Sequence, residues 1–261
     1  MKIALAQVSS GDNWQSNLRN LKLLTQEAAQ QLARAVLFPE NVLYMGERTK
    51  LWNVAKALLE QEVLWQVSDL AQTNQIAILV GGYPELIKGS QKVYNTSVWI
   101  NEQGKELARY RKIHLFDVVT PNGEKHRESD RFMPGEKIVT FQWHDIHIGL
   151  SICFDLRFPE QFRKMAKKGA EWLLVPSAFT CETGQAHWHT LLRARAIENL
   201  ATLLAPAQTG THSTGRKTYG HSLVVGPWGD ILCDVGQKPR LKTIQVPLKE
   251  IRDLRKTFSV F

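Results

Sequence analysis

The sequence predicts an α/β fold of two sheets packed together with helices outside, in a single domain spanning residues 1–261. Short apolar stretches with strand-like composition alternate along the chain with segments whose apolar residues recur every three or four positions. Together they give about twelve strands and about six helices. No linker, low-complexity segment or clear sequence repeat divides the chain.

The N-terminal part has the order strand, helix, strand, helix, strand. Residues 2–8 alternate as a strand, and residues 13–31 place leucines and alanines at helical intervals. Residues 35–38 form a short buried strand. Residues 60–73 repeat the helical period, and residues 76–82 form another apolar strand.

A hairpin and a long loop follow. Residues 93–100 and 105–111 flank an Asn-Glu-Gln-Gly turn in which Gly104 supplies the positive φ. Residues 121–134 are polar and lack periodicity, which predicts a long surface loop. Long loops in compact domains are often functional lids.

The C-terminal half opens on two neighbouring strands at 139–141 and 146–152, the second apolar enough to be buried on both faces. Pro159 and Glu160 suit the first turn of a helix that runs through Lys168. The remaining predicted elements are a strand at 172–176, a loop at 177–184, a helix from about 186 to 199, strands at 201–207 and 222–225 with a loop at 210–220 between them, a hairpin at 225–231, a strand at 241–246 and a short tail at 253–261.

Composition indicates a soluble intracellular protein. No apolar run approaches the roughly 20 residues that span a bilayer. The apolar run within residues 1–13 is too short for a signal peptide. Three cysteines, an odd and sparse set, make a poor disulfide framework and favour the cytoplasm. The formal net charge is +8, but the basic residues are scattered. We therefore expect a solvated basic surface, with no nucleic-acid and no membrane partner.

Several cysteines and histidines suggest other chemistries. Cys181, His187 and His189 are conceivable metal ligands, but they lack a paired zinc-ligand spacing, so we expect no metal. A Cys-His protease would also use a histidine, yet the local cysteine signatures of those families are absent. No nucleotide-binding loop is found, and we expect no cofactor.

Polar residues of three different kinds stand at predicted strand ends. Glu40 follows one buried strand, Lys112 follows the second strand of the hairpin, and Cys153 closes the strand at 146–152. Active sites of α/β folds lie at strand ends. A thiol needs a base or a nearby positive charge to act as a nucleophile, so a Glu and a Lys beside a Cys would supply a base and an oxyanion donor. The backbone N–H of Phe154 is the natural second donor.

Each residue also has a purely structural interpretation. Cys153 could be a buried core cysteine, because free cysteine is among the most buried residue types. Glu40 could cap a helix or loop, and Lys112 could be a solvated charge at a strand end.

The three sites together resemble the carbon-nitrogen hydrolase (nitrilase) superfamily. The resemblance is carried by FPEN around Glu40, RYRKIHLFD around Lys112 and GLSICFDLRFPE around Cys153. It continues through PSAF at 176–179, TGQAHWHTLLRARAIEN at 183–199 and YGHSLVVGPWGDIL at 219–232, and so covers nearly the whole chain.

The resemblance implies an α-β-β-α sandwich of two mixed sheets with outer helices, usually paired into homodimers. It also implies hydrolysis of a small-molecule amide or nitrile through a thioester on Cys153. A second glutamate commonly lies between the Lys and Cys motifs of this superfamily. Glu128 occupies the expected position, where it would keep Lys112 charged, and Glu124 is the competing candidate.

Within the superfamily, the blocks LRFPE and PSAF most resemble the Nit subgroup of amidases. That subgroup includes ω-amidases acting on 2-oxo acid amides and enzymes that hydrolyse deaminated glutathione, and this sequence is more similar to the latter branch. Both substrates carry a carboxylate. Arg157 could clamp it, since the guanidinium fork matches carboxylate geometry, or could instead form an internal salt bridge to Asp155 or a glutamate. Phe179 and Thr180 follow a strand end and could line the pocket.

Overall fold

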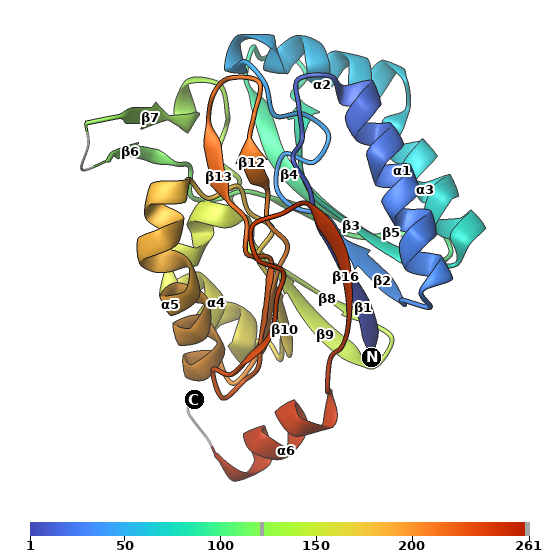
Figure 1. Cartoon of the computed structure of the whole chain (residues 1–261), viewed down its shortest axis with the longest axis vertical. Helices are drawn as coiled ribbons and strands as arrows, with labels where there is room; N and C mark the ends of the chain where they lie inside the picture. The colour runs from blue at the N-terminus through green and yellow to red at the C-terminus, as the bar shows by residue number, and fades with distance from the viewer. Residues whose placement is uncertain (121–122, 259–261) are drawn as a thin grey trace.

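Two six-stranded sheets pack together at the centre of the computed structural model, which describes residues 1–120 and 123–258 (Figure 1). Helices cover the outer side of each sheet, so the molecule has four layers. This arrangement confirms the predicted α/β class with two mixed sheets and outer helices.

The first sheet has the strand order β16-β1-β2-β3-β4-β5. Its members are β1 (Lys2–Gln7), β2 (Ala35–Leu37), β3 (Ala77–Leu86), β4 (Val93–Ile100), β5 (Glu106–Arg111) and β16 (Arg240–Gln245). The strands β1, β2 and β3 are parallel, and the other pairings are antiparallel. Lys2 of β1 lies opposite Gln245 of β16, so segments from the two ends of the sequence are neighbours in this sheet.

Three helices cover the outer face of the first sheet: α1 (Trp14–Gln30), α2 (Leu51–Glu60) and α3 (Val63–Asn74). The two-residue period of a strand divides the core. Ile3 and Leu5 of β1 point into the core shared by the two sheets, whereas Ala4 and Ala6 pack under the helices.

The second sheet repeats the topology of the first. Its order is β15-β14-β11-β10-β9-β8, with β9, β10 and β11 parallel and the remaining pairings antiparallel. The members are β8 (Val139–Trp143), β9 (Ile146–Leu150), β10 (Trp172–Leu174), β11 (Thr202–Ala205), β14 (Leu223–Val225) and β15 (Ile231–Asp234). The helices α4 (Pro159–Lys167) and α5 (Cys181–Asn199) cover it. Each sheet therefore has one antiparallel edge strand, three parallel strands and two further antiparallel strands.

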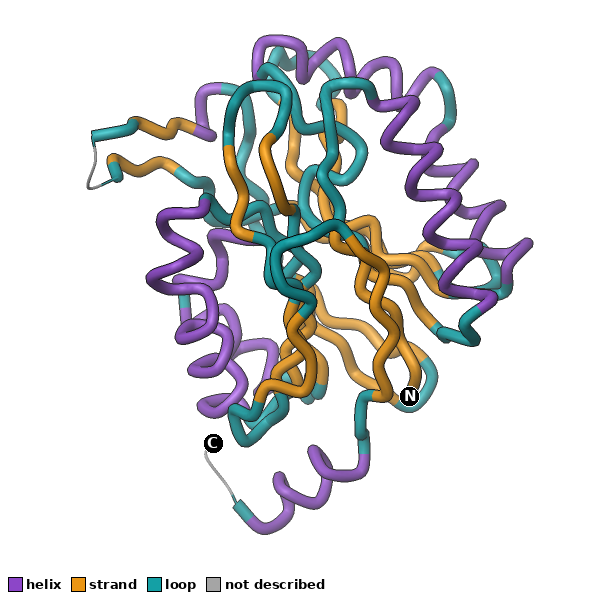
Figure 2. The backbone as a smooth tube through the Cα atoms, in the orientation of Figure 1, coloured by secondary structure: helices purple, strands orange, loops and turns teal. Residues whose placement is uncertain are grey.

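Two hairpins and a last helix lie outside the sheets. Figure 2 shows β6 (Asp117–Val119) and β7 (Lys125–Arg127) projecting from the body, and α6 (Lys249–Thr257) standing apart from both helical layers. The second hairpin pairs β12 (Thr209–Thr211) with β13 (Lys217–Tyr219). No helix among the residues described has the length and apolar character needed to cross a membrane.

The structure corrects two of the three loops predicted from the sequence, those at 121–134 and 210–220. The segment 121–134 contains β7 and a 3-10 turn at Glu128–Asp130, because Val118 and His126 pair across a hairpin. Residues 121–122 lie outside the described part. The loop predicted at 210–220 is mostly the β12–β13 hairpin, with Gly215 at positive φ in its turn.

Three element boundaries also differ from the prediction. The helix predicted at 60–73 corresponds to α3. The helix α2, which was not predicted, precedes it, and the left-handed φ of 48° at Glu62 separates the two helices. The helix α5 starts at Cys181, earlier than predicted, because Thr180 caps it by accepting the Thr183 N–H. The last helix begins at Lys249, and residues 259–261 of the predicted tail are outside the described part.

Candidate active site

A cavity of about 620 Å³ opens where β2, β5 and β9 end. Its lining includes all eight residues that the sequence singled out: Glu40, Lys112, Glu128, Cys153, Phe154, Arg157, Phe179 and Thr180. Cavities of this size typically hold small molecules. Residues spread over 140 positions of the sequence are thus brought together around one space.

Glu40 is held in the segment that follows β2, at only 3% exposure. This segment crosses β3 at Gly81 and Gly82, where the pairing of β3 with β4 shifts register. A Cβ atom on Gly81 would lie 2.0 Å from the carbonyl oxygen of Phe38. Only glycine allows the two backbones to approach this closely, so the Gly-Gly pair fixes where Glu40 enters the cavity.

Lys112 forms a buried ion-paired group with two glutamates. Its Nζ lies 2.9 Å from Oε1 of Glu40, and 3.1 and 2.9 Å from the two carboxylate oxygens of Glu128. Glu124, the alternative to Glu128, has a side chain that is 62% exposed and lies beside His126. The structure therefore brings Glu128, and not Glu124, to the Lys112 ammonium.

The ion pairs set the charges of this group. Burial alone would raise the pKa of Glu40, but the charge and the hydrogen bond of Lys112 hold that pKa below its ordinary value. Burial alone would lower the pKa of Lys112, but the charges of Glu128 and Glu40 raise that pKa well above its ordinary value. At neutral pH Glu40 is a carboxylate and Lys112 an ammonium.

Cys153 stands at a strained turn directly after β9. Its φ is 49°, a left-handed value that non-glycine residues rarely adopt. The turn is a 3-10 helix, Cys153–Arg157, which leads into Pro159 at the start of α4. The N–H of Cys153 donates to the carbonyl oxygen of Pro176 at 3.0 Å. The turn thus directs the side chain into the cavity.

Asp155 holds this turn from below and is completely buried. Its Oδ2 accepts the Ile152 N–H at 2.9 Å and the Tyr110 hydroxyl at 2.6 Å, and its Oδ1 lies 3.0 and 2.8 Å from the backbone and ring nitrogens of His114. The Asp155 carboxylate is fully engaged in these contacts. Asp155 therefore does not form the salt bridge to Arg157 that the sequence analysis left open.

The Cys153 thiol lies close enough to the Glu40 carboxylate for the two groups to affect each other's pKa. Burial and the negative charge of Glu40 raise the pKa of this thiol far above its ordinary value, although Lys112 partly offsets them. Cys153 is therefore a neutral thiol at rest, next to a carboxylate. Such a thiol reacts only if a base removes the proton as the bond forms.

Arg157 faces the cavity without a carboxylate partner among the described residues. Its guanidinium lies over the rings of Phe154 and Phe179, at 5.7 and 5.6 Å, and 3.2 Å from Nδ1 of His187. Thr180 lines the same wall and caps α5. The wall thus offers an arginine whose guanidinium lies against two aromatic rings.

Sequence reasoning missed three contributors to the site. Asn95 donates from Nδ2 to Oε1 of Glu40 at 2.9 Å, the Ala178 N–H donates to Oε2 of Glu40 at 2.9 Å, and Arg216 donates from Nη2 to the Ala178 carbonyl oxygen at 2.8 Å. Asn95 had a signal, because it opens a polar run, Asn-Thr-Ser, inside an otherwise apolar strand. Arg216 had none, since it lies in a polar turn.

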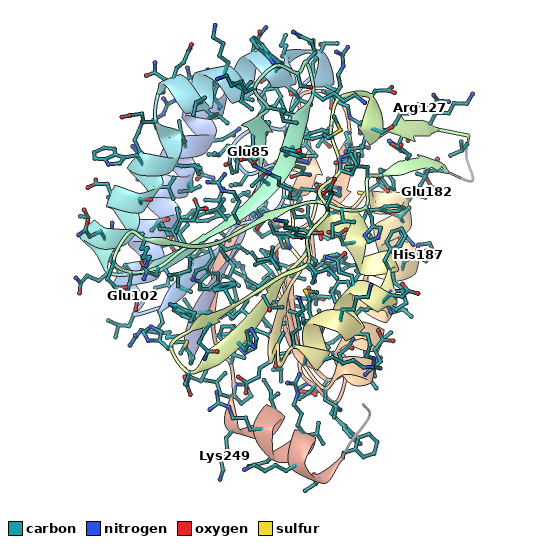
Figure 3. All side chains as sticks on the ribbon, turned by 180° about the vertical axis from the view of Figure 1, so that it is seen from behind. Glu85, Glu102, Arg127, Glu182, His187 and Lys249 are labelled. Carbon is teal, nitrogen blue, oxygen red and sulfur yellow. The ribbon has the colours of Figure 1, made fainter. Side chains whose placement is uncertain are left out.

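The mouth of the cavity lies near the projecting hairpin. Figure 3 shows Arg127 on that hairpin and Glu182 in the first turn of α5 on the same side of the molecule, with His187 farther along the helix. Glu182 lines the cavity. The entrance is therefore bordered by charged side chains of both signs.

The family model described as carbon-nitrogen hydrolase matches residues 2–256. This chain belongs to the carbon-nitrogen hydrolase family. It is 41% identical over 255 residues to a deaminated glutathione amidase of Synechocystis, covering 97% of this chain and 93% of the relative. The predicted superfamily membership is thereby confirmed.

Solved structures of the same family have the same fold. The Caenorhabditis elegans NitFhit protein is 34% identical, with a TM-score of 0.94; the match covers all of this chain and 64% of that longer one. An amidase of Nesterenkonia, solved with acrylamide added to its active-site cysteine, is 29% identical, with a TM-score of 0.83 over 98% of this chain and 97% of the other. The chain is thus an amidase-type carbon-nitrogen hydrolase.

Proposed function

We propose that this protein is a thiol amidohydrolase that cleaves the amide of deaminated glutathione through a thioester on Cys153. The observation that carries the proposal is the contact of Glu40 with both Lys112 and the Cys153 thiol on one wall of a substrate-sized cavity. Similarity to a deaminated glutathione amidase over nearly the whole chain supports this choice of substrate.

In the first half of the reaction, the sulfur of Cys153 attacks the amide carbonyl carbon while its proton passes to Glu40. The negative charge that develops on the carbonyl oxygen is stabilised by the Lys112 ammonium and by the N–H of Phe154. Glu40 then gives its proton to the amide nitrogen, the carbon–nitrogen bond breaks, and the amine leaves. The acyl group remains on sulfur as a thioester.

In the second half, water attacks the thioester carbon and Glu40 accepts a proton from it. The same two donors stabilise the second oxyanion. When the carbon–sulfur bond breaks, Glu40 returns the proton to sulfur, which restores the thiol and releases the carboxylic acid. Glu128 takes no proton in this scheme; it positions Lys112 and keeps it charged.

Arg157 is the residue proposed to bind the substrate carboxylate. It lines the cavity, is free of carboxylate partners among the described residues, and lies within about 6 Å of the rings of Phe154 and Phe179. A planar guanidinium binds a carboxylate through two parallel hydrogen bonds. Phe179 and Thr180 would contact the carbon chain of the substrate next to this pair.

A substrate panel tests the proposal. We expect kcat/KM to be highest for deaminated glutathione, lower for 2-oxoglutaramate, the ω-amidase substrate, and lowest for simple nitriles and N-carbamoyl amino acids. The Cys153→Ala variant should fold normally and lose turnover by about 10⁴-fold or more. A preference for nitriles, or substantial activity in Cys153→Ala, would overturn the proposal.

We also propose that the protein acts in the cytoplasm as a homodimer, without a nucleic-acid or membrane partner. Apart from the family resemblance, exposed apolar side chains support a dimer. Trp228 is 63% exposed, and its ring makes an edge-to-face contact with Phe258. Ile197 of α5 packs against the neighbouring turn at Gly229. Sedimentation equilibrium of the wild type and of Trp228→Ser tests this: the variant should dissociate at higher concentration than the wild type.

A further inference from the structure

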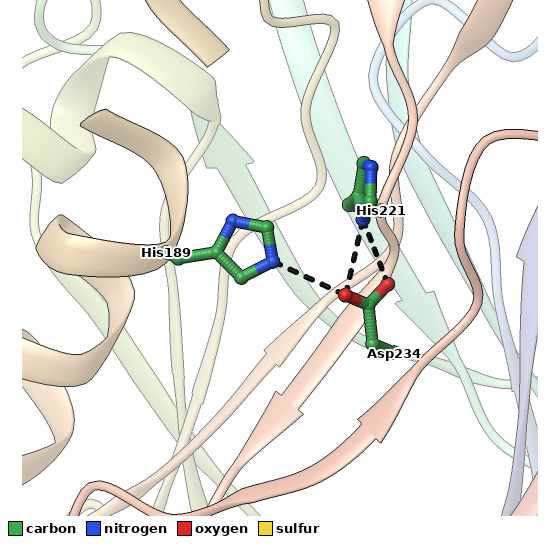
Figure 4. A group of neighbouring side chains, drawn as sticks. All are labelled: His189, His221 and Asp234. Carbon is green, nitrogen blue, oxygen red and sulfur yellow. Dashed lines mark hydrogen bonds and ion pairs between the residues drawn. The ribbon is translucent and has the colours of Figure 1, made fainter. Parts of the chain in front are cut away.

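Three metal-ligating side chains converge outside the cavity (Figure 4). His189 comes from the middle of α5, His221 from the segment before β14, and Asp234 from the end of β15. Nε2 of His189 lies 3.1 Å from Oδ2 of Asp234, and Nδ1 of His221 lies 3.0 Å from both Asp234 oxygens. None of the three lines the cavity, so the amidase chemistry does not account for them.

The donor set is that of a transition-metal site. Two imidazole nitrogens and one carboxylate oxygen are the ligands that Zn²⁺ and its neighbours prefer, and three protein ligands leave room for water. The ligand atoms all lie within 4.8 Å of one another. Bonds of about 2.0 Å in a tetrahedral site place ligand atoms roughly 3.3 Å apart. A small rotation of the two imidazoles would close the site on an ion.

The surroundings hold two of the ligands in place. His221 has a left-handed φ of 53°, and its ring stacks on the Tyr219 ring with centroids 4.4 Å apart. The backbone N–H of His221 donates to the Gly236 carbonyl oxygen at 2.7 Å. Oδ1 of Asp234 accepts the Gly236 N–H at 2.8 Å. Ligand orientation in metal sites commonly depends on such outer contacts.

The site is open to ions from solution. The side chains of His189, His221 and Asp234 are 30, 18 and 31% exposed. Because one ligand comes from a helix and two come from the same end of the antiparallel β14–β15 pair, an ion bound here would join α5 to the second sheet. Trp188, next to His189, donates from Nε1 to the His221 carbonyl oxygen at 2.8 Å.

We propose that His189, His221 and Asp234 form a binding site for one divalent transition-metal ion of the Zn²⁺ type, which clamps α5 to the second sheet. The ion has a structural role and takes no part in amide hydrolysis. The sequence analysis considered His189 only together with Cys181 and His187 and predicted no metal; the fold instead brings His189 to His221 and Asp234, which are distant in sequence.

Metal titration of the full chain tests the proposal. Protein freed of metal with a chelator is titrated with Co²⁺, followed by its visible absorption, and with Zn²⁺, followed by calorimetry. We expect one ion per chain, a Kd in the micromolar range or tighter, and a higher Tm with Zn²⁺. His189→Gln, His221→Gln and Asp234→Asn should each weaken binding at least tenfold and abolish the Tm increase.

Two control variants separate this site from other ligands. His144→Gln removes a histidine that contacts a single carboxylate, Oε1 of Glu102 at 2.7 Å, and should leave binding unchanged. Cys153→Ala removes the reactive thiol and should also retain the ion. Absence of binding at millimolar Zn²⁺ would overturn the proposal. So would loss of binding in Cys153→Ala, or equal binding by the three ligand variants and the wild type. The Tm of each variant without metal verifies that it is folded.

Discussion

The Lys112 ammonium and the Glu128 carboxylate form a two-point contact inside the protein, with Nζ at 3.1 and 2.9 Å from the two carboxylate oxygens. A third contact, to Glu40, occupies the remaining ammonium proton. Lys112 therefore has no proton to spare for a substrate at rest. In the mechanism proposed above, Glu40 weakens its hold on Lys112 when it accepts the Cys153 proton, and that ammonium proton becomes available to the oxyanion. The proposal therefore links proton removal to oxyanion stabilisation.

Replacing Glu40 by Gln should make the Cys153 thiol easier to ionise and yet slow turnover. The negative charge of Glu40 raises the pKa of Cys153, so the variant thiol should ionise at lower pH than the wild-type thiol. Turnover should nevertheless fall by about 10³-fold or more, since no base remains. The rate of alkylation by iodoacetamide as a function of pH, together with mass spectrometry of the acyl-enzyme, measures the two effects.

For this variant, an alkylation midpoint that stays in place or rises would show that Glu40 does not control the thiol pKa. Normal build-up of thioester would show that Glu40 is not the base. Glu47→Gln, a change at an exposed glutamate, is the matched control and should alter neither property.

Replacing Lys112 by Met should destabilise the fold at neutral pH by about 3–5 kcal/mol, because it leaves the Glu40 charge buried without a cation. The wild-type pKa of Glu40 is lowered, so the stability it contributes is present above its ordinary value near 4.5 and is lost as the pH falls through its folded value. The difference between variant and wild type should thus shrink toward acid pH. Urea unfolding at pH 7 and at a series of lower pH values measures it.

The control for Lys112 is Lys50→Met, which breaks a largely exposed pair with Glu47 and should change stability by less than about 1 kcal/mol. A Lys112 variant as stable as the wild type at pH 7 would show that the buried group does not depend on its cation.

Replacing Arg157 by Gln should raise KM for substrates that carry a carboxylate by about 10–100-fold, the value of one charge-assisted contact. kcat/KM for a neutral amide analogue should change little. Arg157→Lys should recover only part of the loss, because an ammonium lacks the planar fork. Arg131→Gln, at an exposed arginine, is the control. An equal loss for charged and neutral substrates would mean that Arg157 shapes the turn rather than binding carboxylate.

Replacing Gly81 by Ala should lower both stability and activity. The new Cβ would meet the Phe38 carbonyl oxygen at 2.0 Å, and backbone must move to relieve the contact. Such crowding costs about 1–3 kcal/mol, and in a chain of this size each kcal/mol lowers Tm by about 2–4 °C. Gly11→Ala, where nothing lies within 4 Å of the added atom, should be nearly neutral in the same thermal melt. Equal Tm values for the two variants would contradict this account.

The sequence predicted the fold class and most elements because its strands and helices carry strong apolar periods. The residues 51–60 were also predictable as a helix, since Leu51, Ala55 and Leu58 recur at helical intervals and are buried. The break at Glu62 was not, because nothing in its side chain favours a left-handed φ. Sheet order depends on contacts between distant segments, such as β1 with β16, which periodicity does not encode.

The candidate site was predictable in part because its main residues follow predicted strands. Glu40, Lys112 and Cys153 each end a strand, and strand ends meet in α/β folds. Their catalytic roles stay predictions. Contacts that depend on three-dimensional placement could not be predicted: the Ala178 N–H on Glu40 comes from a backbone, and His221 reaches His189 only through the fold.

The pairing of Lys2 with Gln245 has a consequence for synthesis on the ribosome. The strand β1 is translated before its antiparallel neighbour β16, which follows all the other described strands in the sequence. During that interval the free edge of β1, an apolar strand, presents unpaired backbone groups to the cell. The first sheet therefore cannot close before β16 has been made, and until then the free edge of β1 is a binding surface for a chaperone or a second nascent chain.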